Sequence, residues 1–238
     1  ANNAFLGCTN LKSVNLPNCV SIYSRVFSSH LRSSIEYVNI GVSWFYGSDF
    51  RSCSNLREIY APNLVGYNEG WLFDGCNNLT IVSFPVLERL LSITLQNKGK
   101  LEVAYLPKVS MLTQSAFYGC TNLRSVNLDS VLEIPNATFA EISSLEEINL
   151  PACRTFASKA FQYCYSLKTV RAPNLESWGS SAFQACPLES VYIGSNVTYV
   201  GSNCIPTSGS AKIYVPNDMV DTYKNGVFSS YSSRIFGY

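Results

Sequence analysis

Residues 117–128 read Phe-Tyr-Gly-Cys-Thr-Asn-Leu-Arg-Ser-Val-Asn-Leu, and residues 5–16 read Phe-Leu-Gly-Cys-Thr-Asn-Leu-Lys-Ser-Val-Asn-Leu. Both follow the pattern F-x-x-C-x-x-L-x-x-V-x-L. A period in the twenties with one short apolar strand per period predicts a solenoid, in which each repeat stacks on the next to build a shared core. The first position of the pattern, the anchor, recurs at intervals of 22 or 23 residues: Phe5, Phe27, Phe50, Phe73, Leu95, Phe117, Phe139, Phe161, Phe183 and Ile205.

An apolar-x-apolar triplet follows each anchor. Alternation with β-branched residues is a strand signal, and a proline, which cannot donate to a β-ladder, follows most triplets, as Pro107 and Pro151 do. The sequence therefore predicts about ten short parallel strands, one per repeat. The triplets begin at Val14, Val38, Ile59, Val82, Ala104, Val126, Ile148, Val170, Val191 and Ile213.

The L-x-x-V-x-L-P strand and the A-F-x-x-C turn, seen at 116–120, resemble the BspA-like, or Treponema-type, class of leucine-rich repeats. The resemblance covers nearly the whole chain. It implies a right-handed leucine-rich-repeat solenoid with a parallel concave sheet and short turns or 3₁₀ segments on the convex side. We expect one domain over 1–238, with about ten repeats in 1–211 and a terminal strand and capping helix in 212–238. Asn217 would be the N-cap of that helix, with Val220 and Tyr223 covering the last repeat.

The composition argues against several classes of function. Of 238 residues, 47% are hydrophobic and 14% charged, and the formal net charge is +1. Such a balance gives no electrostatic reason to bind nucleic acid or an anionic membrane. No apolar run of 18 or more residues predicts a membrane span. No signal peptide is visible, and the chain opens inside a repeat, so we expect further sequence upstream.

The nine cysteines follow the repeat and do not pair at metal-binding spacings. Six lie three residues after an anchor, where a small buried thiol would fill the same position in each repeat: Cys8, Cys53, Cys76, Cys120, Cys164 and Cys186. Cys19, Cys153 and Cys204 are expected to be core residues as well. A metal site needs convergent ligands at short spacing, and His30 is the only histidine. We therefore expect neither a metal nor another cofactor.

The sequence also lacks an evident catalytic set. A cysteine or serine nucleophile needs a nearby base, and His30 lies in an irregular copy of the repeat. Glu146 and Glu147 occupy adjacent positions, so we expect their carboxylates to point to opposite faces. The second irregular copy covers 90–100, where Leu95 replaces the aromatic anchor and Lys98 replaces cysteine. A looser turn or bulge is expected there, and the protein is predicted not to be an enzyme.

The outward side of the predicted sheet is the candidate binding surface. The middle residue of each triplet and the residue before the triplet point away from the core. Tyrosine, arginine and asparagine combine contact area with hydrogen bonding, although strand propensity and asparagine ladders are structural alternatives. Trp44, Phe45, Trp71 and Trp178 form a competing set that would lie elsewhere. The candidate binding residues are Tyr37, Tyr60, Tyr105, Asn127, Asn149, Arg171, Tyr192 and Tyr214.

The resemblance implies a non-enzymatic, adhesin-type module of a bacterial cell-surface or secreted protein, which contacts host or matrix proteins or other cells. We expect a protein ligand and keep a glycan as an alternative, with no nucleic acid and no membrane insertion. A spacer or scaffold within a larger surface protein is the second alternative.

Overall fold

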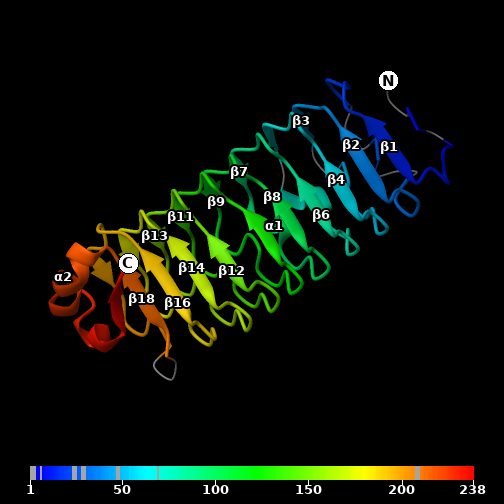
Figure 1. Cartoon of the computed structure of the whole chain (residues 1–238). Helices are drawn as coiled ribbons and strands as arrows, with labels where there is room; N and C mark the ends of the chain where they lie inside the picture. The colour runs from blue at the N-terminus through cyan, green and yellow to red at the C-terminus, as the bar shows by residue number, and fades with distance from the viewer. Residues whose placement is uncertain are drawn as a thin grey trace.

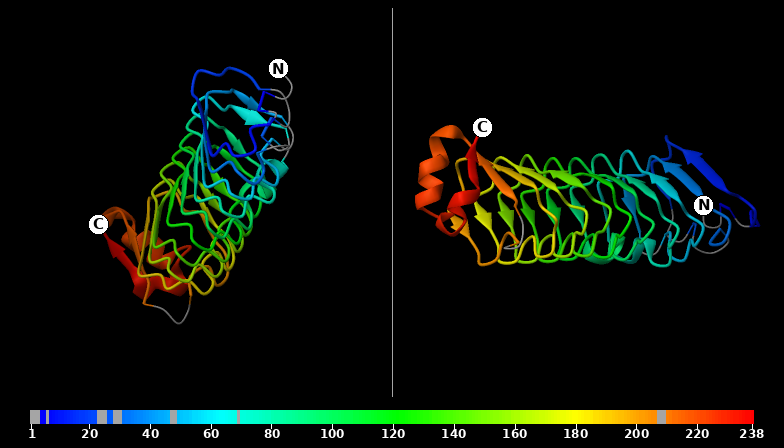
Figure 2. Two further views of the ribbon diagram at one scale, coloured as in Figure 1. Left: turned by 90° about the vertical axis from the view of Figure 1, so that its right-hand side faces the viewer. Right: turned by 60° about the horizontal axis from the view of Figure 1, so that its bottom comes forward.

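The computed structural model describes residues 4–5, 7–22, 26–27, 31–46, 49–68, 70–206 and 210–238. Residues 28–30, where a looser turn was expected at His30, lie outside the described residues. The chain winds into an elongated solenoid whose N- and C-terminal ends lie at opposite ends of the array (Figures 1 and 2). The parallel-sheet solenoid predicted from the repeat is confirmed.

Each predicted triplet lies in or beside a strand. Successive strands pair in parallel with the triplets aligned, as Val14 with Val38 and Val191 with Ile213, in two sheets that divide between Asn127 and Glu147. The solvent side of these strands is called the sheet face below. Its strands are β1 (Ser13–Leu16), β2 (Tyr37–Ile40), β4 (Glu58–Tyr60), β6 (Ile81–Ser83), β8 (Val103–Tyr105), β10 (Ser125–Asn127), β12 (Glu147–Asn149), β14 (Thr169–Ala172), β16 (Ser190–Ile193), β18 (Lys212–Val215) and β19 (Ile235–Gly237).

A second row of two-residue strands, which the sequence reading did not predict, lies on another wall of the solenoid (Figure 1). Phe45, Leu90 and Trp178 each occupy the second position of such a strand and are fully buried. These strands are β3 (Trp44–Phe45), β5 (Gly66–Tyr67), β7 (Arg89–Leu90), β9 (Met111–Leu112), β11 (Glu133–Ile134), β13 (Thr155–Phe156), β15 (Ser177–Trp178) and β17 (Tyr199–Val200).

Tight turns around the anchors form the remaining wall, and their amides donate to the next repeat. Around Phe117, for example, three alternate amides donate to carbonyls one repeat further along: Ser115 to Asn136 at 3.1 Å, Phe117 to Thr138 at 2.9 Å, and Gly119 to Ala140 at 3.2 Å. The positions two before and two after the anchor have positive φ, including non-glycine residues such as Glu141 and Tyr163. That conformation is unfavourable for residues with a Cβ, so the repeated hydrogen bonds offset a strain present in most repeats.

The anchors form an aromatic column through the core. Phe117, Phe139, Phe161 and Phe183 are fully buried, and consecutive ring centroids are 5.2, 5.2 and 4.8 Å apart with nearly parallel planes. Ring pairs at such spacing add stabilisation beyond area burial. The 22-residue period therefore places each ring against its equivalents in the neighbouring repeats.

The weak copy at 90–100 is not the loose turn that we expected. A one-turn helix, α1 (Ser92–Leu95), replaces the turn, and Leu95 is fully buried. The Tyr67 hydroxyl accepts hydrogen bonds from the Leu91 amide at 3.0 Å and from the buried Thr94 hydroxyl at 2.9 Å. Polar contacts from the preceding repeat therefore order this turn. The 3₁₀ segment η1 (Gly70–Phe73) lies one repeat earlier.

The C-terminal end is closed by η2 (Asn217–Met219), α2 (Val220–Asn225) and η3 (Ser229–Arg234), followed by β19, which pairs in parallel with β18. Figure 2 shows this cap over the end of the array. As predicted, Val220 and Tyr223 pack on the core. The assignment of Asn217 as N-cap is wrong, because Asn217 begins η2 and its side-chain amide donates to the Tyr238 carbonyl at 3.1 Å. None of the described helices is long and apolar enough to cross a bilayer.

Tyr223 fixes the cap to the last repeats. Its buried hydroxyl donates to the Gly194 carbonyl at 2.8 Å and accepts from the Val197 amide at 3.0 Å. Tyr223→Phe leaves both backbone groups without a partner, so we expect a loss of about 1–3 kcal/mol of unfolding free energy in urea titrations. Tyr165→Phe, at a well-exposed ring, is the matched control. Equal unfolding midpoints for the two variants would contradict this role.

Candidate functional site

The cysteine column is a structural element of the core. The thiols of Cys76, Cys120, Cys164 and Cys186 each donate to the carbonyl of the preceding repeat's anchor at 2.9–3.0 Å. Cys53 makes the same contact at 3.9 Å. Cysteine at this position therefore fills space and also satisfies a buried carbonyl.

Burial makes these thiols poor nucleophiles. Desolvation raises the pKa of Cys76 and Cys120 to about 12, and that of Cys204 to about 11. The predicted burial of Cys8 is wrong: it is exposed, because no earlier repeat covers it in the described chain. Cys19 is half-buried, whereas Cys153 and Cys204 are buried as expected, and all nine cysteines are free.

Other chemically active groups remain dispersed. Among the described residues, no three His, Cys, Asp or Glu side chains gather as metal ligands would. Glu146 and Glu147 do not separate onto opposite faces as predicted, since both line one hollow of about 430 Å³ beside Arg124. Glu146 also faces Lys168, with 3.9 Å between the charged atoms.

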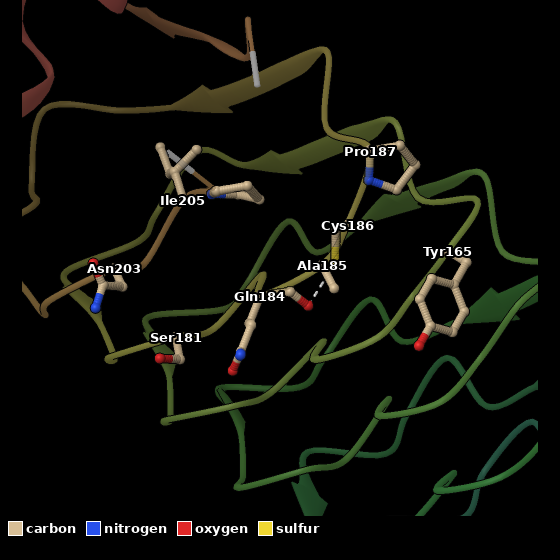
Figure 3. A pocket seen from close by; sticks show the side chains of 9 residues that line it. Tyr165, Ser181, Gln184, Ala185, Cys186, Pro187, Asn203 and Ile205 are labelled. Atoms are coloured by element: carbon tan, nitrogen blue, oxygen red, sulfur yellow. Dashed lines mark hydrogen bonds between the residues drawn. The ribbon is translucent and has the colours of Figure 1, made fainter. Parts of the chain in front are cut away.

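The hollow in Figure 3, about 530 Å³ in volume, lies near the C-terminal end between the turns around Phe183 and Ile205. Tyr165 stands at one side and Asn203 at the other, and none of its lining residues is charged. The Gln184 carboxamide already accepts a hydrogen bond from Gln162 at 2.6 Å. Because neither a charge nor a general base borders the Cys186 thiol there, the described hollow offers little for catalysis or ion binding.

On the sheet face, the predicted binding residues form three groups and one isolated residue, Tyr105. The N-terminal group is Tyr37 and Tyr60, whose ring centroids are 5.6 Å apart. Partial burial and a 3.1 Å hydrogen bond to Glu58 raise the pKa of Tyr60. Tyr105 stands apart as an exposed ring on β8, so it does not join either tyrosine.

The C-terminal group is compact, and the parallel register builds it. Arg171, Tyr192, Tyr214 and Phe236 lie opposite one another on β14, β16, β18 and β19. The Tyr192 and Tyr214 rings stack at 4.7 Å, the Arg171 guanidinium lies 4.1 Å from the Tyr192 centroid, and Phe236 follows Tyr214 at 6.1 Å. We call Tyr192, Tyr214 and Phe236 the aromatic row.

The sequence reading missed Phe236 and its neighbour Tyr238. Phe236 belongs to the C-terminal strand β19, and Tyr238 follows that strand. The cap precedes β19, yet Ile235 keeps the repeat spacing, 22 residues after Ile213, with which it pairs. Tyr238 packs edge-on against Tyr192 at 6.0 Å, and its hydroxyl donates to the Ile193 carbonyl at 3.2 Å. Two signals were available: the short alternation in Ile235-Phe-Gly-Tyr238, and its position 22 residues after the triplet that begins at Ile213.

The third group, Asn127 and Asn149, lies where the sheet is interrupted. β10 and β12 do not pair, although β8 pairs with β10 and β12 with β14. Leu106 donates to Asn127 at 3.2 Å and Leu150 to Arg171 at 2.8 Å, but the equivalent bond from Leu128 to Asn149 is not formed. The sequence does not predict this missing pairing, because Ser125-Val-Asn-Leu128 is identical to Ser13-Val-Asn-Leu16 in β1.

The competing aromatic residues divide between core and surface. Phe45 and Trp178 are fully buried, whereas Trp44 and Trp71 are 37% and 51% exposed. The two exposed rings belong to β3 and η1, away from the strands of the sheet face. They do not form part of the aromatic row.

Comparison with known proteins identifies the repeat family. The model of the BspA type leucine rich repeat region matches in six copies over residues 1–101 and 92–212. The chain belongs to the BspA-type leucine-rich repeat family. No curated protein matches the chain significantly.

Three solved structures were found to be similar to this BspA-type chain, and the first resembles it in fold. The pneumococcal vaccine antigen PcpA has a TM-score of 0.56 at 14% identity over 96% of this chain, which spans 66% of the length of that antigen. A leucine-rich cell-surface protein from Faecalibacterium prausnitzii has 14% identity, a TM-score of 0.35, and coverage of 86% of this chain and 88% of that one. A leucine-rich repeat protein from Bacteroides ovatus has 16% identity, a TM-score of 0.39, and coverage of 100% and 86%.

The difference in burial among the thiols predicts that iodoacetamide will label exposed cysteines in preference to buried ones. At pH 8, a thiol with a pKa of about 12 is ionised in roughly one molecule in ten thousand, so Cys120 should react with iodoacetamide only through local opening. Exposed Cys8 should react fast, as mass spectrometry of tryptic peptides would show. Concentrated guanidinium chloride, in which all nine should react, is the control. Labelling of Cys120 in the folded protein as fast as Cys8 would contradict the buried column.

Proposed function

We propose that this BspA-type chain is a non-enzymatic protein-binding module, and that the aromatic row is its principal contact surface. The observation that carries the proposal is the partly exposed alignment of Tyr192, Tyr214 and Phe236 across three adjacent strands. Aromatic and arginine side chains supply most of the binding energy at protein interfaces. Here Arg171 extends the same line by one strand.

Preorganisation supports binding at this row. Stacking between Tyr192 and Tyr214 and the cation–π contact from Arg171 hold the side chains before a ligand arrives. The Lys212 ammonium lies 5.3 Å from the Phe236 centroid and restrains that ring from the next strand. The free-energy cost of immobilising a flexible side chain on association is about 0.5–1.5 kcal/mol. Preorganisation of these side chains reduces that cost.

The stacking favours a protein ligand over a glycan. A sugar ring that packs on an aromatic residue needs an open ring face, but Tyr192 is covered by Tyr214 on one side and Arg171 on the other. The ring edges and the hydroxyl groups of the two tyrosines remain available for contact with a ligand. These suit the mixed polar and apolar surface of a folded protein, as tyrosine-rich paratopes do.

A non-enzymatic role is supported by the raised thiol pKa values and by the dispersion of acidic groups in the described residues. The surface or secreted location in a bacterium, and a host, matrix or cell-surface partner, extend the family resemblance to this chain. A spacer role would leave the aromatic row without a ligand, so the same binding experiment separates the two proposals.

The test is to screen the folded chain against an array of extracellular-matrix proteins and, in parallel, a glycan array. For any protein bound, Tyr192→Ala with Tyr214→Ala should weaken binding at least about tenfold, since loss of an interface hot spot typically costs more than about 1–2 kcal/mol. Tyr118→Ala with Tyr165→Ala, which removes two rings from the turn side, should leave affinity unchanged.

Unchanged affinity in the row variant would refute the aromatic row as the contact surface. Glycan hits alone would replace the protein ligand by a carbohydrate. Failure to bind any member of either array would favour the spacer.

A further inference from the structure

A one-residue deletion shortens one corner of the array near its C-terminal end. Between the cysteine column and the next leucine, residues 164–167 read Cys-Tyr-Ser-Leu, whereas residues 186–188 read only Cys-Pro-Leu. The missing residue is regained after β16, where three residues, 194–196, take the place of residues 173–174. β14 still pairs with β16 and β15 with β17, so both rows of strands keep their register across the deletion.

At several earlier corners, a side-chain hydrogen bond joins one repeat to the repeat before it. The Ser143 hydroxyl donates to the Thr121 carbonyl at 3.0 Å, and the Ser166 hydroxyl donates to the Ser143 carbonyl at 2.6 Å. Pro187 has neither an amide hydrogen nor a polar side chain, so it cannot continue this series. The hollow of about 530 Å³ in Figure 3 is lined by Pro187 and lies where the series stops.

Tyr165 presents an aromatic ring to this hollow. The residue lies at the corner one repeat before Pro187 and is 61% exposed. Tyr163 stacks on the ring with 6.1 Å between the centroids, and no other ring or cation of the described chain does so. One face of Tyr165 is therefore open, whereas Tyr192 is covered on both sides. The π face of tyrosine is the negative side of its quadrupole and attracts polarised C–H groups.

Three uncharged polar side chains also line the hollow: Ser181, Gln184 and Asn203. In Figure 3, Asn203 and Tyr165 lie on opposite sides of the hollow, with Gln184 between them. The Gln184 oxygen accepts from Gln162, which leaves the amide hydrogens of Gln184 for a ligand. Within the described chain, the side chains of Ser181 and Asn203 have no hydrogen-bond partner, so both can donate and accept.

The lining selects a neutral ligand that has both polar and apolar surface. None of the described lining residues is charged, so a bound ion would lose its hydration without a compensating charge. A wholly apolar ligand would exclude water from the Gln184 and Asn203 amides and leave them unpaired. A saccharide ring meets neither difficulty, because it carries hydroxyl groups around its edge and C–H groups on its faces. The volume also lies in the range of about 300–1,000 Å³ that is usual for small-ligand pockets.

We propose that this hollow binds a neutral saccharide. A C–H face of the sugar packs on the open face of Tyr165, and its hydroxyl groups bond to Gln184 and Asn203. The hollow lies on the wall of turns around the anchors, whereas the aromatic row lies on the sheet face. The saccharide site is therefore separate from the proposed protein-binding surface and does not depend on it.

The test is to screen the folded chain on an array of neutral oligosaccharides and to titrate each bound saccharide in solution. Tyr165→Ala removes the ring and should weaken binding at least about tenfold, whereas Tyr165→Phe keeps the ring and should bind within about twofold of the wild type. Tyr118→Ala removes a turn-side tyrosine outside the hollow and should not change the affinity. Unfolding midpoints in urea check that each variant is folded.

Gln184→Ala tests the polar side of the hollow and should weaken binding independently of Tyr165. Tyr118→Ala is its matched control as well, because Tyr118 and Gln184 each directly follow an anchor. Nuclear magnetic resonance gives a readout that needs no variant. On addition of the saccharide to the wild type, the side-chain amide signals of Gln184 and Asn203 should shift, whereas that of Asn55 should not.

The proposal is overturned if no neutral saccharide binds, if Tyr165→Ala binds the saccharide as the wild type does, or if the Gln184 and Asn203 signals do not shift. It is also overturned if Tyr192→Ala with Tyr214→Ala, rather than Tyr165→Ala, abolishes saccharide binding, because the sugar would then lie on the aromatic row. Protein binding at the row is measured separately and should not change in Tyr165→Ala, so failure of one site is distinguishable from failure of the other.

Discussion

Everything in this solenoid depends on hydrogen bonds between backbone groups one repeat apart. A single repeat has too little core to be stable alone, and its short strands find partners only in the repeats before and after. Parallel pairing in constant register then determines where the side chains lie. The aromatic column around Phe139, the thiol–carbonyl contacts of Cys120 and the surface row at Tyr192 all arise because equivalent residues are brought opposite one another.

The same rule explains how substitutions in the repeat are accommodated. Leu95 takes the place of an aromatic anchor, yet its carbonyl still accepts the Cys120 thiol at 3.0 Å. Lys98 replaces the cysteine and is nearly buried, and its ammonium reaches the Gln96 carbonyl at 3.4 Å. Tyr67, in the repeat before, holds the altered turn. A weak copy is therefore held in place by its neighbours, which local sequence cannot show.

Most periodic features were predicted from the sequence, whereas the strand after the cap and the interruption of the sheet were missed. The strands near Val38 and Val191 and the buried column through Phe161 follow from spacing and alternation. Phe236 was missed because the cap separates β18 from β19 in the sequence, although Phe236 keeps the 22-residue spacing from Tyr214 and pairs with it. The separation of β10 from β12 was missed for a different reason, since identical residues in β1 pair normally. Position within the array, more than residue identity, decides what Asn127 contacts.

The turn wall gives the array a direction. Its amides donate toward the next repeat, as Ser115, Lys159 and Ser181 do, and its carbonyls receive from the repeat before. The two sides of one repeat are therefore chemically different: along this wall one side presents amide donors and the other presents carbonyl acceptors. A repeat can be inserted or duplicated only in the orientation of its neighbours, because an inverted one would set donor against donor. Growth of such a protein by tandem duplication thus preserves the bonding pattern automatically, whereas a symmetric back-to-back junction through this wall does not.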